Sequence, residues 1–362
     1  MTDNDWTEDA KNASPDGEFV RDTTYIQDRV SPEVSEKTPQ DNGTTLWPME
    51  AGRYRLMGAR ACPWAHRSII TRRLMGLEDT ISLALAGPTH DVRSWRFDLD
   101  PDGKDPVTGI HRLQEAYFNR FPDYERGITV PALVEEESVE VVSNDYNWIV
   151  RDFITQWTQF HREGAPDLYP AAHQDEIEEL NERIFHDINN GVYRCGFAGS
   201  QDAYDKAYQR LWEALDWVEE RLGQQRYMVG NHLTETDIRL YVTLIRFDPV
   251  YYSHFKCSRH KLAEMPNIRG YMQELFQIPG FGDTTDFQEI KEHYYIVQTD
   301  INPTQVVPVG PDMDWLMEDH DRGRFGGQPF AAGTTLPGPL PAGEHLKNPE
   351  DFQLELPAVK PV

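Results

Sequence analysis

The sequence predicts two domains, an α/β domain followed by an all-helical one. Strand-like and helix-like segments alternate over roughly residues 50–155, whereas residues 160–295 show only the apolar spacing of helices. A chain of 362 residues is long enough for two domains that each bury a core. We therefore expect an α/β plus all-α architecture, with the α/β domain over residues 46–158 and the helical domain over residues 159–300.

The segments outside these domains differ from them in composition. Residues 1–45 are rich in Asp, Thr, Pro, Asn and Glu, which predicts an extended, partly disordered N-terminal arm. Residues 301–362 form a C-terminal extension, and from Gly326 onward this extension is dense in Pro and Gly. We expect this tail either to lack regular structure or to wrap a neighbour in extended form.

Charge and cysteine content restrict the environment in which the chain works. The net charge of −26, from 35 basic and 61 acidic residues, disfavours nucleic acids and anionic membranes as partners. Residues 1–18 are polar and acidic, without the basic and apolar regions of a secretory signal. The cysteines Cys62, Cys195 and Cys257 are too few and too far apart for a disulfide framework. We therefore expect a cytoplasmic protein.

The predicted α/β domain begins with a strand–helix–strand unit. Residues 53–58 can form a strand, and residues 81–85 can form a second one. Between them, apolar residues recur at helical spacing over residues 67–77. A long polar insertion at residues 87–109 then separates this unit from a further predicted helix at residues 110–121.

Two strands and a helix complete this domain. Residues 128–134 and 139–142 are strand-like and are joined by an acidic turn. Residues 144–153 can start a helix, with Ser143 or Asn144 as its N-terminal cap. The predicted order is therefore βαβ, then α, then ββ, then α.

The second domain carries three apolar stripes at helical spacing, over residues 177–188, 204–222 and 238–245. Thr234 and Asp237 precede the last stripe at the spacing of a capping box, with Asp where Glu or Gln is usual. We therefore expect a buried helix to begin directly after Thr234.

Cys62 is the strongest candidate for chemistry. It follows a predicted strand and precedes a predicted helix, and Pro63 occupies the preferred first helical position. Free N–H groups and the helix dipole favour an anion there, so a thiol at this point ionises more readily. His66 and Arg67, one turn along, can add positive potential. The alternative is a buried cysteine that only packs.

Cys62 has no resolving cysteine, because Ala65 occupies the last position of the Cys-x-x-Cys pattern. The implied chemistry is a mixed disulfide with a small thiol, resolved by a second molecule of that thiol.

Val130 and Pro131 form the second candidate feature, because a proline at the start of a strand in this fold order is often cis. Such a proline turns the backbone of Val130 outward, where it can pair with a bound thiol. The alternative is an ordinary edge-strand proline.

Other patterns are weaker. His254, Cys257 and His260 have metal-like spacing, but a structural zinc site needs a fourth ligand, so we expect no metal. An aromatic substrate needs stacking faces and phenolic donors, although tyrosines more often belong to a core or an interface. Five tyrosines are candidates: Tyr193, Tyr251, Tyr252, Tyr294 and Tyr295.

At residues 61–67, Ala-Cys-Pro-Trp-Ala-His-Arg, the chain resembles the glutathionyl-hydroquinone reductases, also called xi-class, omega-like glutathione transferases. The resemblance covers about residues 45–310. Its other motifs are Trp47-Pro48, Gly52-Arg53-Tyr54, Ser94-Trp95, Thr129-Val130-Pro131, Gly191 to Arg194, Gly196 to Ala198, Asp237 to Leu240, Arg246 to Tyr251, His254 to Cys257, His293 to Tyr295 and Ile301 to Pro303.

The resemblance implies a fold, an assembly and a set of site residues. The fold is a thioredoxin-like N-terminal domain followed by an all-helical glutathione-transferase C-terminal domain, in a homodimer. Cys62 is implied as the nucleophile that attacks the sulfur of an S-conjugated hydroquinone, with no permanently bound cofactor. The residues implied to hold the thiol cosubstrate are Trp95, Arg126, Val130 and Pro131. Those implied to hold the quinol are Tyr193, one of Tyr294 or Tyr295, and Arg246.

One position departs from the family pattern. The family grips the γ-glutamyl end of glutathione with an acidic residue followed by Ser, and this chain has Asp145 followed by Tyr146. Asp is shorter than Glu, and the tyrosine ring replaces a compact hydroxyl donor. Glutathione and a small thiol without a γ-glutamyl group, such as mycothiol, therefore both stay open as cosubstrates.

Three functions remain compatible with these residues. The first is a reductase that removes a thiol from a hydroquinone. The second is a broader thiol transferase, acting in deglutathionylation, dehydroascorbate reduction or reductive dehalogenation through the same thiolate. The third is a binding or regulatory protein that has kept the fold and lost turnover.

Overall fold

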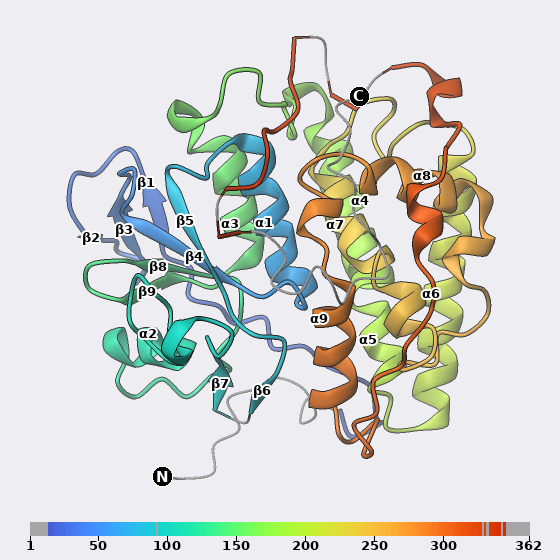
Figure 1. The fold of residues 1–362 in the computed structure, drawn as a ribbon, viewed down its shortest axis with the longest axis horizontal. Helices are drawn as coiled ribbons and strands as arrows, with labels where there is room; N and C mark the ends of the chain where they lie inside the picture. Colours follow the sequence, from blue (N-terminus) through green and yellow to red (C-terminus); the bar gives the residue numbers. More distant parts are fainter. Residues whose placement is uncertain (1–13, 92, 328, 331–332, 342, 345–362) are drawn as a thin grey trace. The chain divides into compact units, whose positions relative to one another are not determined.

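The chain folds as two compact units (Figure 1), in a computed structural model that describes residues 14–91, 93–327, 329–330, 333–341 and 343–344. The first unit comprises Asp22–Arg162 and the described part of Leu340–Lys347. The second comprises Glu163–Pro339 and the described part of Ala10–Arg21. The first unit is α/β and the second is helical, which agrees with the predicted fold class.

A four-stranded mixed sheet forms the centre of the first unit, in the order β5–β4–β8–β9. β4 (Tyr54–Gly58) and β5 (Ile81–Leu85) are parallel, as expected of strands joined by a helix. β8 (Ala132–Glu135) runs antiparallel to both β4 and β9 (Glu140–Ser143). Every residue of β4 is buried, because both faces of this central strand are covered.

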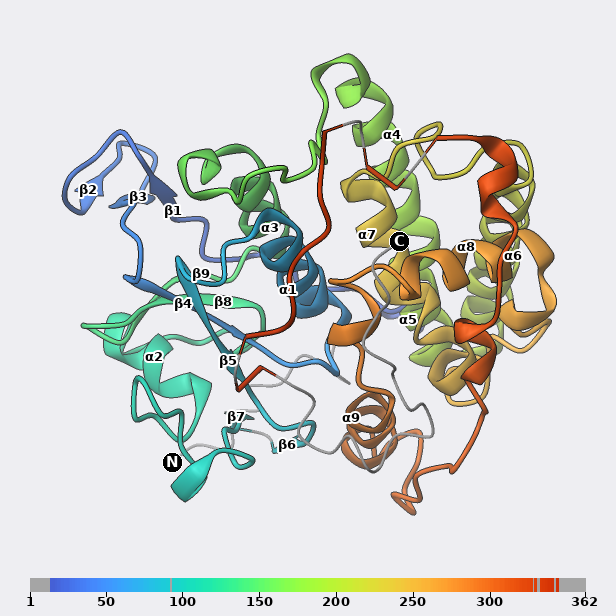
Figure 2. The same ribbon diagram turned by 45° about the horizontal axis from the view of Figure 1, so that its top comes forward.

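Helices cover both faces of this sheet: α1 (Pro63–Met75), α2 (Leu113–Arg120) and α3 (Tyr146–Thr155). α1 and α3 lie side by side on one face, and α2 lies against the other (Figures 1 and 2). α1 ends at Gly76, which adopts a left-handed φ of 72°. A Cβ at Gly76 would lie 2.5 Å from the Cβ of Arg162, so both the conformation and the space require glycine.

Short strands also lie where the sequence predicted none. β6 (His90–Asp91) and β7 (Ser94–Trp95) pair as an antiparallel hairpin within the polar insertion. A second sheet, in the order β1–β3–β2, lies mostly in the segment expected to be an extended arm. It contains β1 (Arg29–Ser31), β2 (Thr38–Pro39) and β3 (Thr45–Pro48), and β3 continues past the predicted end of that arm at residue 45. Strands of two to four residues are too short for an alternating pattern to stand out.

The second unit is built from helices and π-helical turns. Its α-helices are α4 (Gln174–Ile184), α5 (Gly191–Gly196), α6 (Gln201–Leu222), α7 (Glu235–Leu244), α8 (Pro266–Phe276) and α9 (Phe287–Glu292). Its π-helical turns are Phe185–Asn189, Phe247–Tyr251 and His293–Val297. All residues of α7 are buried, so this helix lies in the core of the unit.

The predicted capping box at the start of α7 is confirmed. Asp237 Oδ2 accepts the N–H and the hydroxyl of Thr234, at 2.9 and 3.3 Å. Asp237 Oδ1 accepts the N–H of Met228 at 2.9 Å and the hydroxyl of Tyr271 at 2.8 Å. The shorter Asp therefore serves here because its second oxygen ties the helix start to two other segments.

The Pro/Gly-rich tail bonds to its own chain as far as it is described. The carbonyl of Pro329 accepts the N–H of Leu233 at 2.9 Å. Near its end, both carboxylate oxygens of Glu344 bind the guanidinium of Arg72 in α1, at 2.7 and 2.8 Å. Arg60 donates to the Glu344 carbonyl at 2.6 Å. The tail beyond residue 344 lies outside the described residues.

Glu344→Ala is expected to destabilise the protein by about 3 kcal/mol, because it leaves the fully buried Arg72 without its carboxylate partner. Urea unfolding followed by circular dichroism measures this change. Glu318→Ala is the matched control, since Glu318 pairs with Arg269 at the exposed surface and such pairs contribute little. Equal unfolding midpoints for the two variants would show that the tail does not support α1.

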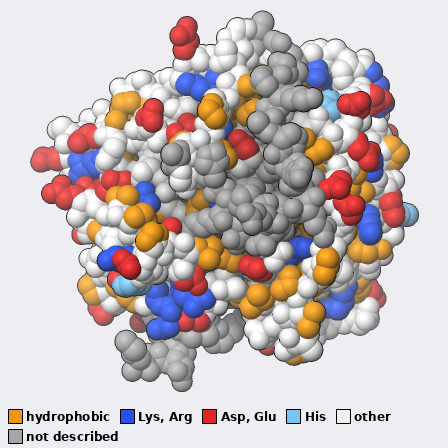
Figure 3. All heavy atoms as spheres, in the orientation of Figure 1, with side chains coloured by type: hydrophobic (Ala, Val, Ile, Leu, Met, Phe, Trp, Pro, Cys, Tyr) orange, Lys and Arg blue, Asp and Glu red, His pale blue; other side chains and the backbone are white. Residues whose placement is uncertain are grey.

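Among the described residues, no helix has both the length and the apolar character to cross a membrane. Asp and Glu side chains lie along the edges of the face shown in Figure 3, with Lys and Arg between them. The described part of that face therefore mixes both signs of charge, with acidic side chains in excess over the whole sequence.

Candidate active site

Cys62 lies at the N-terminal cap position of α1, as the sequence predicts. Its N–H donates to the carbonyl of Ala59 at 3.1 Å in the turn after β4, and its carbonyl accepts the N–H of His66 at 3.0 Å. Pro63 occupies the first turn of α1, which contains no acidic residue. The thiol therefore faces the positive end of a helix with no carboxylate in that turn to oppose ionisation. Cys62 keeps 7% of its surface exposed.

The second predicted feature, Val130 and Pro131, lies next to Cys62. The Val130–Pro131 peptide bond is cis, and the Cys62 thiol donates to the Val130 carbonyl at 3.5 Å. Tyr117 donates to the Thr129 carbonyl at 3.0 Å, which holds the loop before the proline in place. The thiol of Cys62 and the backbone beside the cis proline are therefore in direct hydrogen-bond contact.

Trp95, predicted to hold the thiol cosubstrate, lies in β7 and is 7% exposed. Its ring packs edge-on against the ring of His90 in β6, with the centroids 4.8 Å apart. Trp95 therefore comes from the hairpin within the polar insertion, which sequence periodicity did not reveal.

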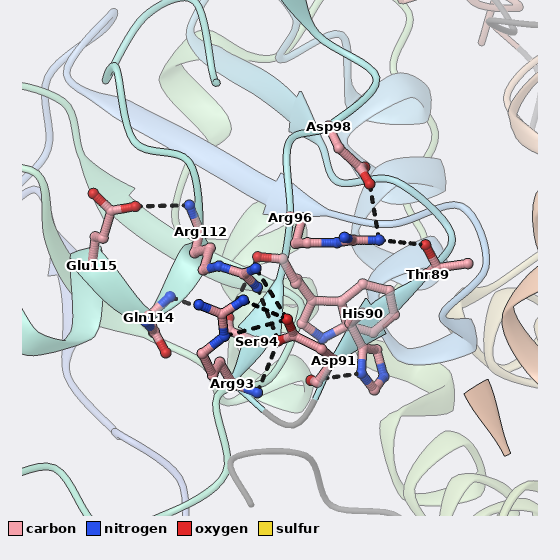
Figure 4. Close-up of polar contacts among 11 residues, drawn as sticks. Thr89, His90, Asp91, Arg93, Ser94, Arg96, Asp98, Arg112, Gln114 and Glu115 are labelled. Carbon is pink, nitrogen blue, oxygen red and sulfur yellow. Dashed lines mark hydrogen bonds and ion pairs between the residues drawn. The ribbon is translucent and has the colours of Figure 1, made fainter. Parts of the chain in front are cut away.

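Ion pairs hold this hairpin in place (Figure 4). Asp91 binds the guanidinium of Arg93 at 2.7 Å and that of Arg112 at 2.9 and 3.0 Å. Partial burial alone would raise the pKa of Asp91, but the hydrogen bonds and charges of Arg93 and Arg112 outweigh it and hold that pKa well below its ordinary value. The Ser94 hydroxyl also accepts the N–H of Gln114 in α2, at 3.2 Å. These contacts fix the backbone that leads into Trp95.

Arg126, the other residue predicted to hold the thiol, is exposed and pairs with Asp22 at 2.9 Å. Asp22 comes from the segment before β1, which the sequence treated as part of an arm. A carboxylate of a bound thiol would therefore compete with Asp22 for this guanidinium.

Asp145, rather than the predicted Ser143 or Asn144, caps α3. One oxygen of Asp145 accepts the N–H groups of Asn147 at 3.1 Å and Trp148 at 3.4 Å. The prediction was wrong because tertiary contacts engage the two preceding side chains. The Ser143 hydroxyl donates to a backbone carbonyl, and the Asn144 amide bridges two loops.

Tyr146, the first residue of α3, is 4% exposed and packs on Trp64 with ring centroids 4.7 Å apart. Trp64 lies two residues after Cys62, so the Tyr146 ring is part of the wall beside the thiol-bearing helix start. The guanidinium of Arg67 covers both rings, 4.6 Å from Trp64 and 5.5 Å from Tyr146. Tyr25 packs edge-on against the outer side of Tyr146 at 5.3 Å.

In the second unit, three tyrosine hydroxyls form one hydrogen-bonded group, called here the tyrosine cluster. Tyr294 bonds Tyr193 at 2.7 Å and Tyr251 at 2.8 Å through their hydroxyls. Burial raises the pKa of Tyr294 well above its ordinary value, the neighbouring tyrosines raise it further, and the charge of Arg246 only partly opposes them. Tyr294 therefore stays protonated at neutral pH and can donate.

Tyr295 does not join this cluster. Its hydroxyl bonds the Ser253 hydroxyl at 2.6 Å, and its ring lies 4.6 Å from the ring of His254. Of the two adjacent candidates, Tyr294 is thus the one grouped with Tyr193. Arg246 is fully buried and donates to the Val242 carbonyl at 2.7 Å.

The metal-like spacing of His254, Cys257 and His260 has another explanation. His254 Nε2 bonds Gln298 Oε1 at 2.9 Å, and Cys257 lies buried beside the Phe255 carbonyl. Within the described ranges, no three His, Cys, Asp or Glu side chains gather as a metal site would require.

His254 makes stability depend on pH. Burial lowers its pKa below 6.5, so it stays neutral in the folded protein while the unfolded chain takes up a proton. Stability is therefore lost as the pH falls below about 6.5. Relative to His254→Gln, the wild type should lose stability between pH 7.5 and 5.5 in urea unfolding. The contributions of the other histidines cancel because both proteins contain them. A stability difference between the two proteins that did not change with pH would show that His254 does not cause this pH dependence.

Sequence reasoning did not assign roles to several residues that complete these groups. Trp64 lies within the Cys62 motif but was not singled out, and Tyr251 was noted only as a tyrosine more often found in cores. Asp22 and Tyr25 gave no signal, and Asn144 was predicted only as a helix cap, because their contacts join segments about a hundred residues apart. Chemically, the first unit offers a thiol at a helix start beside a backbone carbonyl, and the second offers phenolic hydroxyls.

Comparison with known proteins identifies related chains. The family model for the glutathione S-transferase N-terminal domain matches residues 61–156, and that for the C-terminal domain matches residues 201–274. The glutathionyl-hydroquinone reductase YqjG of Escherichia coli strain K12 is 40% identical over 316 residues, which cover 86% of this chain and 95% of YqjG.

Solved structures agree with this relationship. A glutathione transferase from Gordonia bronchialis matches with a TM-score of 0.85 and 56% identity, covering 89% of this chain and 98% of that one. A xi-class glutathione transferase from Natrialba magadii matches with a TM-score of 0.77 and 36% identity, covering 86% and 97%. The glutathione-bound structure of YqjG matches with a TM-score of 0.76 and 40% identity, covering 82% and 96%.

Proposed function

The chain belongs to the glutathionyl-hydroquinone reductases, the xi class of the glutathione transferase family, and on that premise we propose that it is a thiol-dependent reductase of S-conjugated hydroquinones. The observation that carries the proposal is the position of the Cys62 thiol, at the start of α1 and 3.5 Å from the carbonyl beside a cis proline.

The proposed reaction has two steps. The Cys62 thiolate attacks the sulfur of the conjugate, the carbon–sulfur bond breaks, and the quinol carbon takes up a proton as the free hydroquinone leaves. Cys62 is then held in a mixed disulfide. A second thiol attacks this disulfide, releases an oxidised thiol dimer and restores Cys62. No cysteine in α1 competes for this step, because position 65 is Ala65.

The thiol part of both substrates is recognised in the first unit. The backbone of Val130, held beside Pro131, pairs with the cysteine portion of the thiol. Trp95 contributes an indole fixed by its braced hairpin, and Arg126 contributes an exposed guanidinium for a carboxylate. Asp145 and Tyr146 face the other end of the thiol.

The quinol is held by Tyr193 and Tyr294. The Tyr294 hydroxyl is protonated, so the cluster that it forms with Tyr193 can donate to a phenolic oxygen, and the neighbouring aromatic rings offer stacking faces. Arg246 acts through its charge on Tyr294 rather than through an exposed guanidinium. Tyr295 lies outside this group.

The cosubstrate is a small cysteine-containing thiol, with no permanently bound cofactor. Glutathione is bound in the structure of YqjG, which supports glutathione or a close analogue here. Mycothiol is an alternative because it also presents a cysteine portion to the Val130 backbone.

We also propose a cytoplasmic homodimer, on the strength of the family resemblance and the spacing of the cysteines.

Turnover of a purified glutathionyl-hydroquinone tests the reaction class. With an added thiol, chromatography should show continuous release of free hydroquinone. Without it, release should stop after the first turnover. Incubation with the disulfide form of glutathione, mycothiol or γ-glutamylcysteine, followed by mass spectrometry of the intact protein and of its peptides, should show a mixed disulfide on Cys62, because the thiolate attacks the disulfide and releases one thiol. Hydroquinone release without any Cys62 adduct would rule out the mixed disulfide.

A further inference from the structure

Residues 22–27, called here the N-terminal strap, lie against the end of β9 and the start of α3. The Ile26 N–H donates to Asn144 Oδ1 at 2.7 Å, and the Ser143 hydroxyl donates to the Ile26 carbonyl at 2.7 Å. Gln27 pairs with Ser143 as an isolated antiparallel bridge. The strap thus extends the sheet edge at the point where the thiol end opposite Arg126 would bind.

Asn144 connects the strap to the cis-proline loop. Its side-chain oxygen accepts from Ile26, and its side-chain nitrogen donates to the Thr129 hydroxyl at 2.9 Å. Thr129 directly precedes Val130, whose carbonyl lies beside Cys62. The strap is therefore part of the same hydrogen-bonded frame as the thiol site.

The polar groups at the start of α3 that a γ-glutamyl end could use are already engaged. The first free N–H groups of α3 could bind a ligand carboxylate, but Asp145 accepts two of them through one oxygen. The other Asp145 oxygen accepts the Gln27 side chain from the strap at 3.4 Å. A γ-glutamyl carboxylate at these N–H groups would have to displace Asp145, and a γ-glutamyl ammonium would compete with Gln27 for the Asp145 carboxylate.

Aromatic rings fill the adjoining space. Tyr146 is 4% exposed, and its ring contacts those of Trp64, at 4.7 Å, and Tyr25 of the strap, at 5.3 Å. Arg67 covers the inner pair of rings and places a positive charge there. This wall offers apolar faces and a cation, which suit a small uncharged group better than an ammonium.

We propose that Tyr146 and the strap select the cosubstrate, admitting thiols whose cysteine nitrogen carries a small uncharged acyl group and disfavouring the γ-glutamyl group. This selection rests on the proposed function, because it concerns the thiol site of that reaction. Asp22 adds to it at the other end, since its pair with Arg126 must open before a carboxylate binds. That pair is exposed and opens at little cost, so the main discrimination lies at Tyr146.

Two ligands that differ only at the cysteine nitrogen test this selection: S-methylglutathione and S-methyl-N-acetylcysteinylglycine. Neither can form a disulfide, so calorimetric binding reports the site independently of turnover. The wild type should bind the N-acetyl ligand at least about tenfold more tightly, since charged groups without partners weaken binding. Asp145→Glu combined with Tyr146→Ser should shift this ratio at least about tenfold toward S-methylglutathione, and Tyr146→Phe, which keeps the ring, should preserve it.

Tyr208→Ser, at a half-buried tyrosine of α6 in the second unit, is the matched control and should leave the ratio unchanged. Equal or tighter binding of S-methylglutathione by the wild type would overturn the selection, and so would a ratio unmoved in the double variant. Turnover of the two matching hydroquinone conjugates separates this result from the reaction itself. If the wild type bound the two ligands with the expected selectivity but turned over neither hydroquinone conjugate, the proposed function would be rejected and the selection would stand.

Discussion

Cys62→Ala is expected to lower the reduction of thiol–hydroquinone conjugates by at least about a thousandfold, because it removes the atom that forms the mixed disulfide. The fold should remain, since the Cys62 backbone bonds to Ala59 and His66 do not involve the sulfur. The side chain donates a weak hydrogen bond to the Val130 carbonyl. Hydroquinone release followed by chromatography, with the melting temperature as a check on folding, measures both effects.

The control for this loss is Cys195→Ala, which removes a buried thiol from α5 in the second unit. It should keep nearly all activity and still show a thiol adduct on Cys62 by mass spectrometry. Cys62→Ala should show no adduct elsewhere. Reduction that survives in Cys62→Ala would mean that the conjugate is cleaved without an enzyme thiolate, and the reductase mechanism would fail.

Local sequence signals accounted for much of the fold and for the core of the site. A strand, a Cys-Pro pair and a helical apolar pattern place Cys62 at a helix start without any long-range information. The same holds for the capping box of Thr234 and Asp237, where the residues concerned lie three apart. Such features depend on backbone groups within one turn, so pattern and geometry agree.

Choices between neighbouring residues could not be made from the sequence. Ser143, Asn144 and Asp145 are all good helix caps, and Asp145 takes the role only because the strap engages the other two. Tyr294 and Tyr295 differ by one position in a π-helical turn, so their side chains point in different directions. Long-range contacts decide both cases, and a single sequence carries no record of them.

Tyr294→Phe is the second change with a large expected effect, and it tests the substrate rather than the nucleophile. It should lower kcat/KM for quinol conjugates by about a hundredfold, the effect of removing one positioned hydrogen-bond donor from a transition state. Reduction of a mixed disulfide without a quinol should stay within about threefold of the wild type, because Cys62 chemistry is untouched. Parallel assays with a glutathionyl-hydroquinone and a glutathione mixed disulfide measure this split.

The split separates a quinol-specific reductase from a broader thiol transferase. Tyr241→Phe is the matched control, because it also removes a buried tyrosine hydroxyl, one that bonds Thr285 at 2.9 Å outside the tyrosine cluster. It should affect both substrates little. If Tyr294→Phe lowered both activities equally, Tyr294 would be structural, since its hydroxyl joins Tyr193 and Tyr251. If it lowered neither, the quinol would not be held by the tyrosine cluster. The protein would then recognise only the thiol portion of its substrates, and a broader thiol transferase would be the better description.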